Sequence, residues 1–159
     1  MLAKLWMNFI APLLRRPPRY QVAALCYRES ERGLEVLLVT SLETKRWILP
    51  KGWPKKGFDA EGTALDEAWE EAGIRPVGSG RGLIGRYRYT KRLRGNVPVV
   101  TDVDVYAFEG AELQSDFPEA DRRERRWMTP EEAAEKVDEP QLKTLLRDLP
   151  ASLRSLERA

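Results

Sequence analysis

Four acidic side chains lie within six residues near the middle of this chain: Asp66, Glu67, Glu70 and Glu71. On an α-helix the three glutamates fall within one arc of about 100°, and like charges three or four residues apart destabilise an isolated helix by roughly 0.2–0.5 kcal/mol per pair. No Lys or Arg between residues 57 and 73 offsets them. A hard divalent cation would offset these negative charges, because carboxylate oxygens are its preferred ligands. The spacing therefore indicates a candidate metal site.

A helix and the loop in front of it must position these acids. Asp59 is suited to the N-cap of the helix, and Gly73 to the left-handed residue that ends one. A separate arc of the helix is suited to packing on a core. Its residues are Ala64, Leu65, Ala68, Trp69 and Ala72. The sequence thus predicts an amphipathic acidic helix that follows a loop, residues 50–58, rich in Gly, Pro and Lys.

The stretch from Gly52 to Ile74 resembles the Nudix box, G-x5-E-x7-R-E-U-x-E-E-x-G-U, in which U is an aliphatic residue. The matching positions are Gly52, Glu67, Ala68, Glu70, Glu71, Gly73 and Ile74. Residues 46–50, RWILP, are similar to the strand that leads into the box. Phe58 and Asp66 depart from the motif, which has Glu and Arg there. In the family those two side chains typically pair and brace the loop against the helix, so we interpret the double change as a replaced brace.

The resemblance extends over roughly residues 20–149, although only the box is specific. It implies an α/β fold of the α+β type: a Nudix-like α/β/α sandwich with a mixed sheet, in which the box forms a loop–helix–loop. Hydrophobic patterns and turn signals predict the elements around the box. These are strands at 22–27, 34–40 and 46–49, a hairpin with arms 84–92 and 99–108, and helices starting at Thr129 and spanning 140–149.

The predicted domain occupies residues 19–150, with a C-terminal tail at 151–159. Before it, residues 1–18 form an apolar extension with helical spacing that is too short to span a bilayer. We predict that this extension is a helix covering an exposed patch of the domain or of a partner subunit, which leaves a homodimer open. Contact with a membrane surface, helped by Arg15 and Arg16, is the second interpretation.

Composition excludes several kinds of chemistry. The chain has no His, which removes Ser-His-Asp and Cys-His catalysis and the usual zinc sites. Acid–base chemistry must then come from carboxylates, Lys, Tyr or metal-bound water. The single Cys26 excludes an internal disulfide and fits a reducing, cytoplasmic compartment. A net charge of +2 argues against nucleic acid as a partner.

The resemblance implies a Mg²⁺ enzyme in which Mn²⁺ is expected to substitute. We assign Glu67, Glu70 and Glu71 as metal ligands, joined by the backbone carbonyl of Lys51 or Gly52. One of Glu70 and Glu71 also accepts a proton from the attacking water, and we favour Glu71. Some relatives carry a further acid before a late strand; the candidates, among which the sequence does not choose, are Glu119, Asp121 and Glu124.

Basic residues around the box suit an anionic small-molecule substrate. Lys51 and Lys55 lie in the loop that would face the metal ions. Arg46 resembles a phosphate-contacting position of diphosphoinositol-polyphosphate phosphohydrolases. We predict that these three side chains bind substrate. The Arg-rich segment 86–94 either contacts the substrate or is a solvent-facing hairpin, and we interpret the cluster at 122–126 as a solvated turn.

The predicted function is hydrolysis of a phosphoanhydride bond in a nucleoside-diphosphate-linked or similar polyphosphorylated molecule. The region around the box is most similar to the branch that acts on diphosphoinositol polyphosphates and dinucleoside polyphosphates, and nucleotide sugars are a further substrate class. The alternative, suggested by Phe58 and Asp66, is a Nudix-like domain with weakened catalysis that binds a nucleotide or polyphosphate as a sensor. A third interpretation is RNA binding, or removal of a 5′-end pyrophosphate, through the Arg-rich hairpin.

Overall fold

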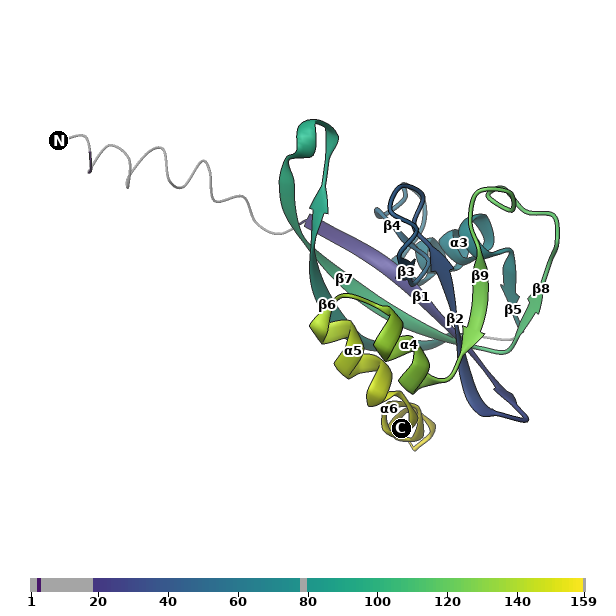
Figure 1. The fold of residues 1–159 in the computed structure, drawn as a ribbon. Coiled ribbons are helices and arrows are strands. Elements are labelled where there is room, and N and C mark those ends of the chain that lie inside the picture. The colour runs from purple at the N-terminus through teal and green to yellow at the C-terminus, as the bar shows by residue number, and fades with distance from the viewer. Residues whose placement is uncertain (1–2, 4–18, 78–79, 159) are drawn as a thin grey trace.

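A computed structural model describes residue 3, residues 19–77 and residues 80–158. Its main sheet has seven strands: β1 (Arg19–Ser30), β2 (Gly33–Thr40), β3 (Trp47–Ile48), β4 (Lys51–Gly52), β6 (Gly80–Arg92), β7 (Pro98–Glu109) and β9 (Arg125–Met128). The order is β3-β2-β1-β7-β6, with β4 paired to β1 and β9 to β2. Among the strands of the described residues, only β1 and β7 pair in parallel, so the sheet is mixed (Figure 1). A separate two-stranded sheet joins β5 (Ile74–Pro76) to β8 (Ala111–Leu113).

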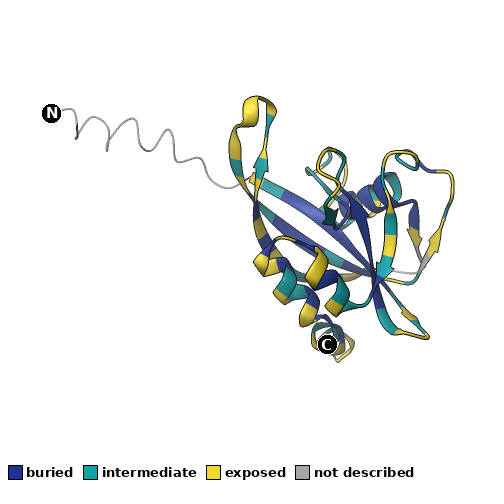
Figure 2. Cartoon of the chain, viewed as in Figure 1, coloured by how far each residue is buried: buried dark blue, intermediate teal, exposed yellow. Residues whose placement is uncertain are grey.

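Strand β1 lies between two hydrophobic cores and is buried along most of its length (Figure 2). Helix α3 (Ala60–Ala72) packs on one face of the sheet, and α4 (Pro130–Lys136), α5 (Pro140–Arg147) and α6 (Leu149–Glu157) pack on the other (Figure 1). Because successive side chains of a strand point to opposite faces, Val22 and Ala24 join the core with α3, while Ala23 and Leu25 join the core with α4 to α6. The predicted α/β/α sandwich is therefore confirmed.

Helix α3 begins and ends at its predicted caps. The Asp59 carboxylate accepts a hydrogen bond from the Gly62 N–H at 2.6 Å, and Gly73 has the left-handed φ of 63°. The predicted packing face is confirmed at Ala64, Ala68 and Ala72, which are fully buried, but not at Leu65. Leu65 is 36% exposed, whereas Glu67 is only 7% exposed. The alanines of the helix are small enough to lie flat on the sheet, and this turns the acids inward rather than Leu65.

The two strands that precede the box and the hairpin after it agree with the prediction. β6 and β7 pair in antiparallel register around the short 3-10 helix η2 (Arg94–Asn96), where Gly95 has a φ of 75°. The predicted N-terminal helix, 1–18, lies outside the described residues except for residue 3. Within the described part of the chain, no helix combines the length and the apolar character needed to cross a membrane.

The helix predicted at 140–149 is confirmed as α5, which ends at Arg147, and α6 follows after Asp148. The predicted C-terminal tail was wrong. The residues predicted to be a tail from 151 onward continue α6 to Glu157, and Leu153 is buried in the core. Leu149, Leu153 and Leu156 recur at helical spacing and pack against the α4–α6 side of the sheet, which stabilises this extra helix.

Candidate functional site

The acidic face of α3 meets the loop that precedes it. Glu67 and Glu71 are each 7% exposed, whereas Glu70 is half-buried. Glu67 presses on the backbone of Gly52, where an added Cβ would overlap its carboxylate. Glycine at position 52 is therefore required for this approach. The contact places the backbone of β4 beside Glu67, the arrangement that the predicted carbonyl ligand needs.

Glu71 is held by groups from two other segments. The backbone N–H of Lys51 donates to its Oε2 at 3.2 Å, and Nη2 of Arg123 donates to its Oε1 at 3.3 Å. Burial raises the pKa of Glu71 to about 8; Arg123 acts in the opposite direction, and the negative charge of Glu67 adds to the rise. Burial likewise raises the pKa of Glu67. Two adjacent carboxylates are thus kept in a poorly solvated place, where a cation would stabilise their charged forms.

Lys55 supplies a positive charge to the acids in this structure. Its Nζ lies 3.0 Å from Glu67, 3.2 Å from Glu70 and in contact with Asp66. Its backbone N–H also donates to Thr63 Oγ1 at 3.3 Å. Lys55 therefore fastens the loop to α3 through Asp66, which supports the interpretation of a replaced brace. The exposed Phe58 takes no part in these ion pairs.

The predicted metal ligands are adjacent but do not converge on one point. Among the described residues, no three acidic or Cys side chains are grouped as an ion site, and the Lys55 ammonium lies between Glu67 and Glu70 instead. The donor set nonetheless suits Mg²⁺, because it consists of carboxylate oxygens beside the β4 backbone. The ligand assignment stays a prediction.

Arg123 is a site residue that the sequence analysis missed. It was assigned to a solvated turn, but its side chain is 7% exposed. Its guanidinium donates to Glu119 at 2.8 Å and to the Thr40 carbonyl at 2.9 Å, in addition to Glu71. The four-residue spacing of Glu119 and Arg123 was the available signal. Glu119 is one of the three acids considered as a further metal ligand, and this ion pair gives it a structural role.

Arg125 belongs to the same misassigned cluster. Its Nη1 donates to the Ala72 carbonyl at 2.7 Å and so binds a free carbonyl at the C-terminus of α3. Arg122, by contrast, is 62% exposed, as predicted. Arg123, before β9, and Arg125, the first residue of β9, therefore hold the acidic helix in place and are not part of a solvated turn.

A cavity of about 850 Å³ opens beside Glu71. Basic side chains are prominent in its lining: Arg46, Lys51, Arg88, Lys91, Arg92 and Arg123. The structure thus brings Arg46 and Lys51 to one cavity with Glu71, whereas the ammonium of Lys55 lies on the acids of α3. The Lys51 ammonium is 5.0 Å from the centre of the Tyr89 ring, and burial lowers its pKa to about 8.

Arg46 is already paired with acids of the cavity lining. Its Nη1 donates to Glu139 Oε1 at 2.6 Å and lies 3.7 Å from Asp138. Its guanidinium carbon is 6.0 Å from the centre of the Tyr89 ring. The charge of Arg46 is thus largely neutralised by these acids. Arg46 is therefore a weaker candidate for contacting phosphate than Lys51, Lys91 and Arg92.

Known proteins resemble the chain both in sequence and in fold. The NUDIX domain family model matches residues 17–149. Nudix hydrolase 4 of Arabidopsis thaliana is 30% identical over 102 residues, which cover 64% of this chain and 47% of that protein. The bovine (Bos taurus) diphosphoinositol polyphosphate phosphohydrolase 3-beta is 34% identical over 120 residues, covering 71% and 65%. The chain thus spans between about half and two thirds of the length of these relatives.

Solved structures agree with the fold. A NUDIX hydrolase from Nitrosomonas europaea superposes with a TM-score of 0.65 at 18% identity, over 85% of this chain and 90% of that one. The Ap4A hydrolase of C. elegans gives a TM-score of 0.57 at 20% identity, over 86% and 99%. At such identities the likeness concerns the fold alone. Together with the family match over residues 17–149, it shows that the chain belongs to the Nudix family.

Proposed function

We propose that this chain is a Mg²⁺-dependent hydrolase that cleaves a phosphoanhydride bond in a polyphosphorylated small molecule. The observation that carries the proposal is the cavity in which Glu71 of the box helix shares the lining with Lys51, Lys91 and Arg123. A phosphate chain needs such positive charges beside the catalytic acids. The candidate substrates are dinucleoside polyphosphates, diphosphoinositol polyphosphates and nucleotide sugars, and the names of the bovine and nematode relatives support the first two.

The chain's own residues have distinct roles in this proposal. Glu67, Glu70, Glu71 and the carbonyl of Lys51 or Gly52 would hold Mg²⁺. When bound, the ion supplies charge neutralisation on the phosphoryl oxygens and helps to make a water nucleophilic. Glu71 accepts the proton of the attacking water, and its place in the cavity lining supports it over Glu70.

The basic side chains orient the substrate. Lys51 and Arg123 lie on either side of Glu71, since both donate hydrogen bonds to its carboxylate, the former through its backbone. Lys51, Lys91 and Arg92 line the cavity, where their side chains would contact phosphoryl oxygens of the substrate. In-line placement of the attacked phosphorus is a matter of positioning, which is the main contribution of protein groups to phosphoryl transfer.

Turnover of a substrate panel tests the proposal. Purified protein is incubated with diadenosine tetraphosphate, diphosphoinositol pentakisphosphate and ADP-ribose in Mg²⁺, and again with excess EDTA. We expect metal-dependent cleavage of at least one compound between two phosphorus atoms. Calorimetric binding without cleavage at saturating Mg²⁺ and Mn²⁺ would instead establish the sensor alternative, and absence of both would contradict the proposal.

A further inference from the structure

Helix α3 carries an exposed apolar stripe on the side opposite Glu67 and Glu71. The stripe has four members at helical spacing: Phe58, just before the helix, and Gly62, Leu65 and Trp69 within it. Phe58 is 52% exposed and Leu65 is 36% exposed. A Cβ added at Gly62 would lie 3.3 Å from the Phe58 ring, which shows that this ring lies along the helix. Helix α3 therefore has a second apolar side besides the one that packs on the sheet.

The open part of the apolar stripe extends from Phe58 to Leu65. At the other end Trp69 is half-buried, and the guanidinium carbon of Arg75 lies 3.9 Å from the centre of its ring. Single exposed apolar residues are ordinary on a protein surface. Residues spaced by four and three positions are different, because this spacing forms the seam along which two helices pack. The stripe therefore indicates a second helix as its occupant.

The extension, residues 1–18, joins the domain beside the loop that holds Phe58. The guanidinium carbon of Arg19, the first residue of β1, is 5.8 Å from the centre of the Trp53 ring in that loop. At full extension, residues 12–18 can bridge about 23 Å. Residues 1–11 are therefore within reach of the apolar stripe of the same chain.

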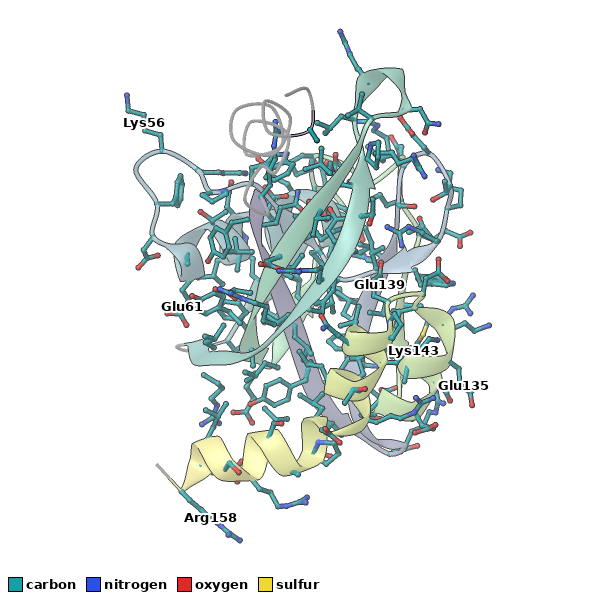
Figure 3. All side chains as sticks on the ribbon, turned by 90° about the vertical axis from the view of Figure 1, so that its left-hand side faces the viewer. Lys56, Glu61, Glu135, Glu139, Lys143 and Arg158 are labelled. Atoms are coloured by element: carbon teal, nitrogen blue, oxygen red, sulfur yellow. The ribbon has the colours of Figure 1, made fainter. Side chains whose placement is uncertain are left out.

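The sequence of the extension complements the apolar stripe in spacing and in charge. Leu2, Trp6 and Phe9 are spaced by four and three residues, as are the members of the open part of the stripe. Pro12 follows them, at a position where it would end a helix rather than interrupt the seam. The extension carries three basic side chains and no acid, whereas α3 carries five acids and no base. One of these acids, Glu61, is labelled in Figure 3.

We propose that residues 1–11 form a helix that packs on the apolar stripe of its own chain, alongside α3. The contact removes apolar surface of both helices from water, which stabilises their association. It also gives a partner to Phe58, which takes no part in the ion pairs that Lys55 makes with α3. The extension and Lys55 then hold the loop in front of α3 from two sides of the helix.

Disulfide trapping tests this contact in the full-length chain. Leu65→Cys is combined with one cysteine of the extension at a time: Leu2→Cys, Trp6→Cys or Phe9→Cys. The natural Cys26 is buried and does not compete. After oxidation of the dilute protein, we expect a crosslink within one chain in at least one combination. The matched control uses Leu83→Cys on β6 in place of Leu65→Cys, because Leu83 is 51% exposed and lies outside the stripe. It should give about tenfold less crosslinked monomer, since a tether without docking provides a lower effective concentration.

Crosslinks between two chains would overturn the proposal and would identify a second copy as the occupant. Equal crosslinking of Leu65→Cys and Leu83→Cys, or no crosslink at all, would overturn it as well. In that case, sedimentation of the wild-type protein with vesicles of phosphatidylcholine and phosphatidylglycerol would identify a membrane surface as the partner of the extension.

Thermal unfolding decides the question if the cysteine variants fail to fold. Leu65→Gln and Phe9→Gln should each lower the unfolding midpoint by about 2–4 °C, and the double variant should fall no further than the larger single change. Leu83→Gln should be additive with Phe9→Gln. Additive shifts for the Leu65 pair would overturn the proposal. None of these measurements depends on turnover, so the outcome is independent of the proposed function.

Discussion

The acidic helix α3 and the hairpin of β6 and β7 are both crowded with one sign of charge, but they neutralise it in different ways. In the hairpin, Arg86 pairs with Asp104 at 2.6 Å and Arg88 with Asp102 at 2.7 Å, each with the residue directly opposite in the strand register. These arginines are more than half exposed. The hairpin therefore balances its charges within itself.

Helix α3 cannot do so. Glu67 and Glu71 are buried, and their counter-charges come from Lys55 in the loop and Arg123 after β8. Burial of unpaired carboxylates is unfavourable, so this arrangement must be stabilised by tertiary contacts. In α3 the counter-charges come from distant segments of the chain and are buried, which indicates a functional site. In the hairpin they come from the facing strand and the arginines are exposed, which is typical of an ordinary surface.

The largest effect should come from the acids of α3. Glu71→Gln keeps the shape of the side chain and removes its ability to accept a proton, so we expect kcat to fall about 10²- to 10⁴-fold. Glu70→Gln is measured in parallel, because it is the alternative base. Glu135→Gln is the control, since this residue is exposed on α4 (Figure 3). Undiminished turnover in both Glu71→Gln and Glu70→Gln would show that neither glutamate takes part in the reaction.

Arg123→Ala should have the largest effect on stability. It leaves Glu71 and Glu119 with one fewer counter-charge in a buried place, and removing one partner of a buried ion pair costs about 3–5 kcal/mol. Urea unfolding measures the loss. Arg122→Ala, at a 62% exposed neighbour, should stay within about 0.5 kcal/mol of wild type. Equal values for the two variants would mean that Arg123 does not stabilise α3.

Lys55→Met should strengthen binding of Mn²⁺ to the protein without substrate. The ammonium lies 3.0 Å from Glu67 and 3.2 Å from Glu70, the carboxylates that we propose for the metal. Two like charges about 4 Å apart repel by about 1 kcal/mol even in bulk water, so we expect roughly fivefold tighter binding by calorimetry. Lys56→Met is the control, because this side chain points away from the domain (Figure 3). Weaker binding would show that Lys55 instead orders the acids.

The smallest effect should come from the hairpin. Arg81→Ala breaks the pair of Arg81 on β6 with Glu109 on β7, which is exposed at both ends, and such pairs contribute little and are screened by salt. We expect a slight shift of the urea midpoint that disappears in 1 M NaCl, and no change in turnover. A shift as large as that of Arg123→Ala would contradict the distinction between the two regions.

The fold was predictable from the sequence to the extent that its signals are local. The caps Asp59 and Gly73, the strands on either side of the Gly33 turn and the hairpin all follow from patterns a few residues long. The errors arose where packing decides. The end of the chain was predicted as a tail, although Leu153 is buried in the core. Leu65 was predicted to pack on the core together with Ala64 and Ala68, but only the two alanines are buried.

For the site, the sequence by itself determined the acidic stripe Glu67, Glu70 and Glu71 and the motif glycine at position 52, because helical spacing and motif register are properties of one short segment. Only the tertiary structure decided which charges meet this stripe. Arg123 lies 52 residues from Glu71, and Glu139 lies 93 residues from Arg46. Contacts across such separations depend on strand order and on packing of side chains against the sheet, neither of which is encoded in the residues immediately around them.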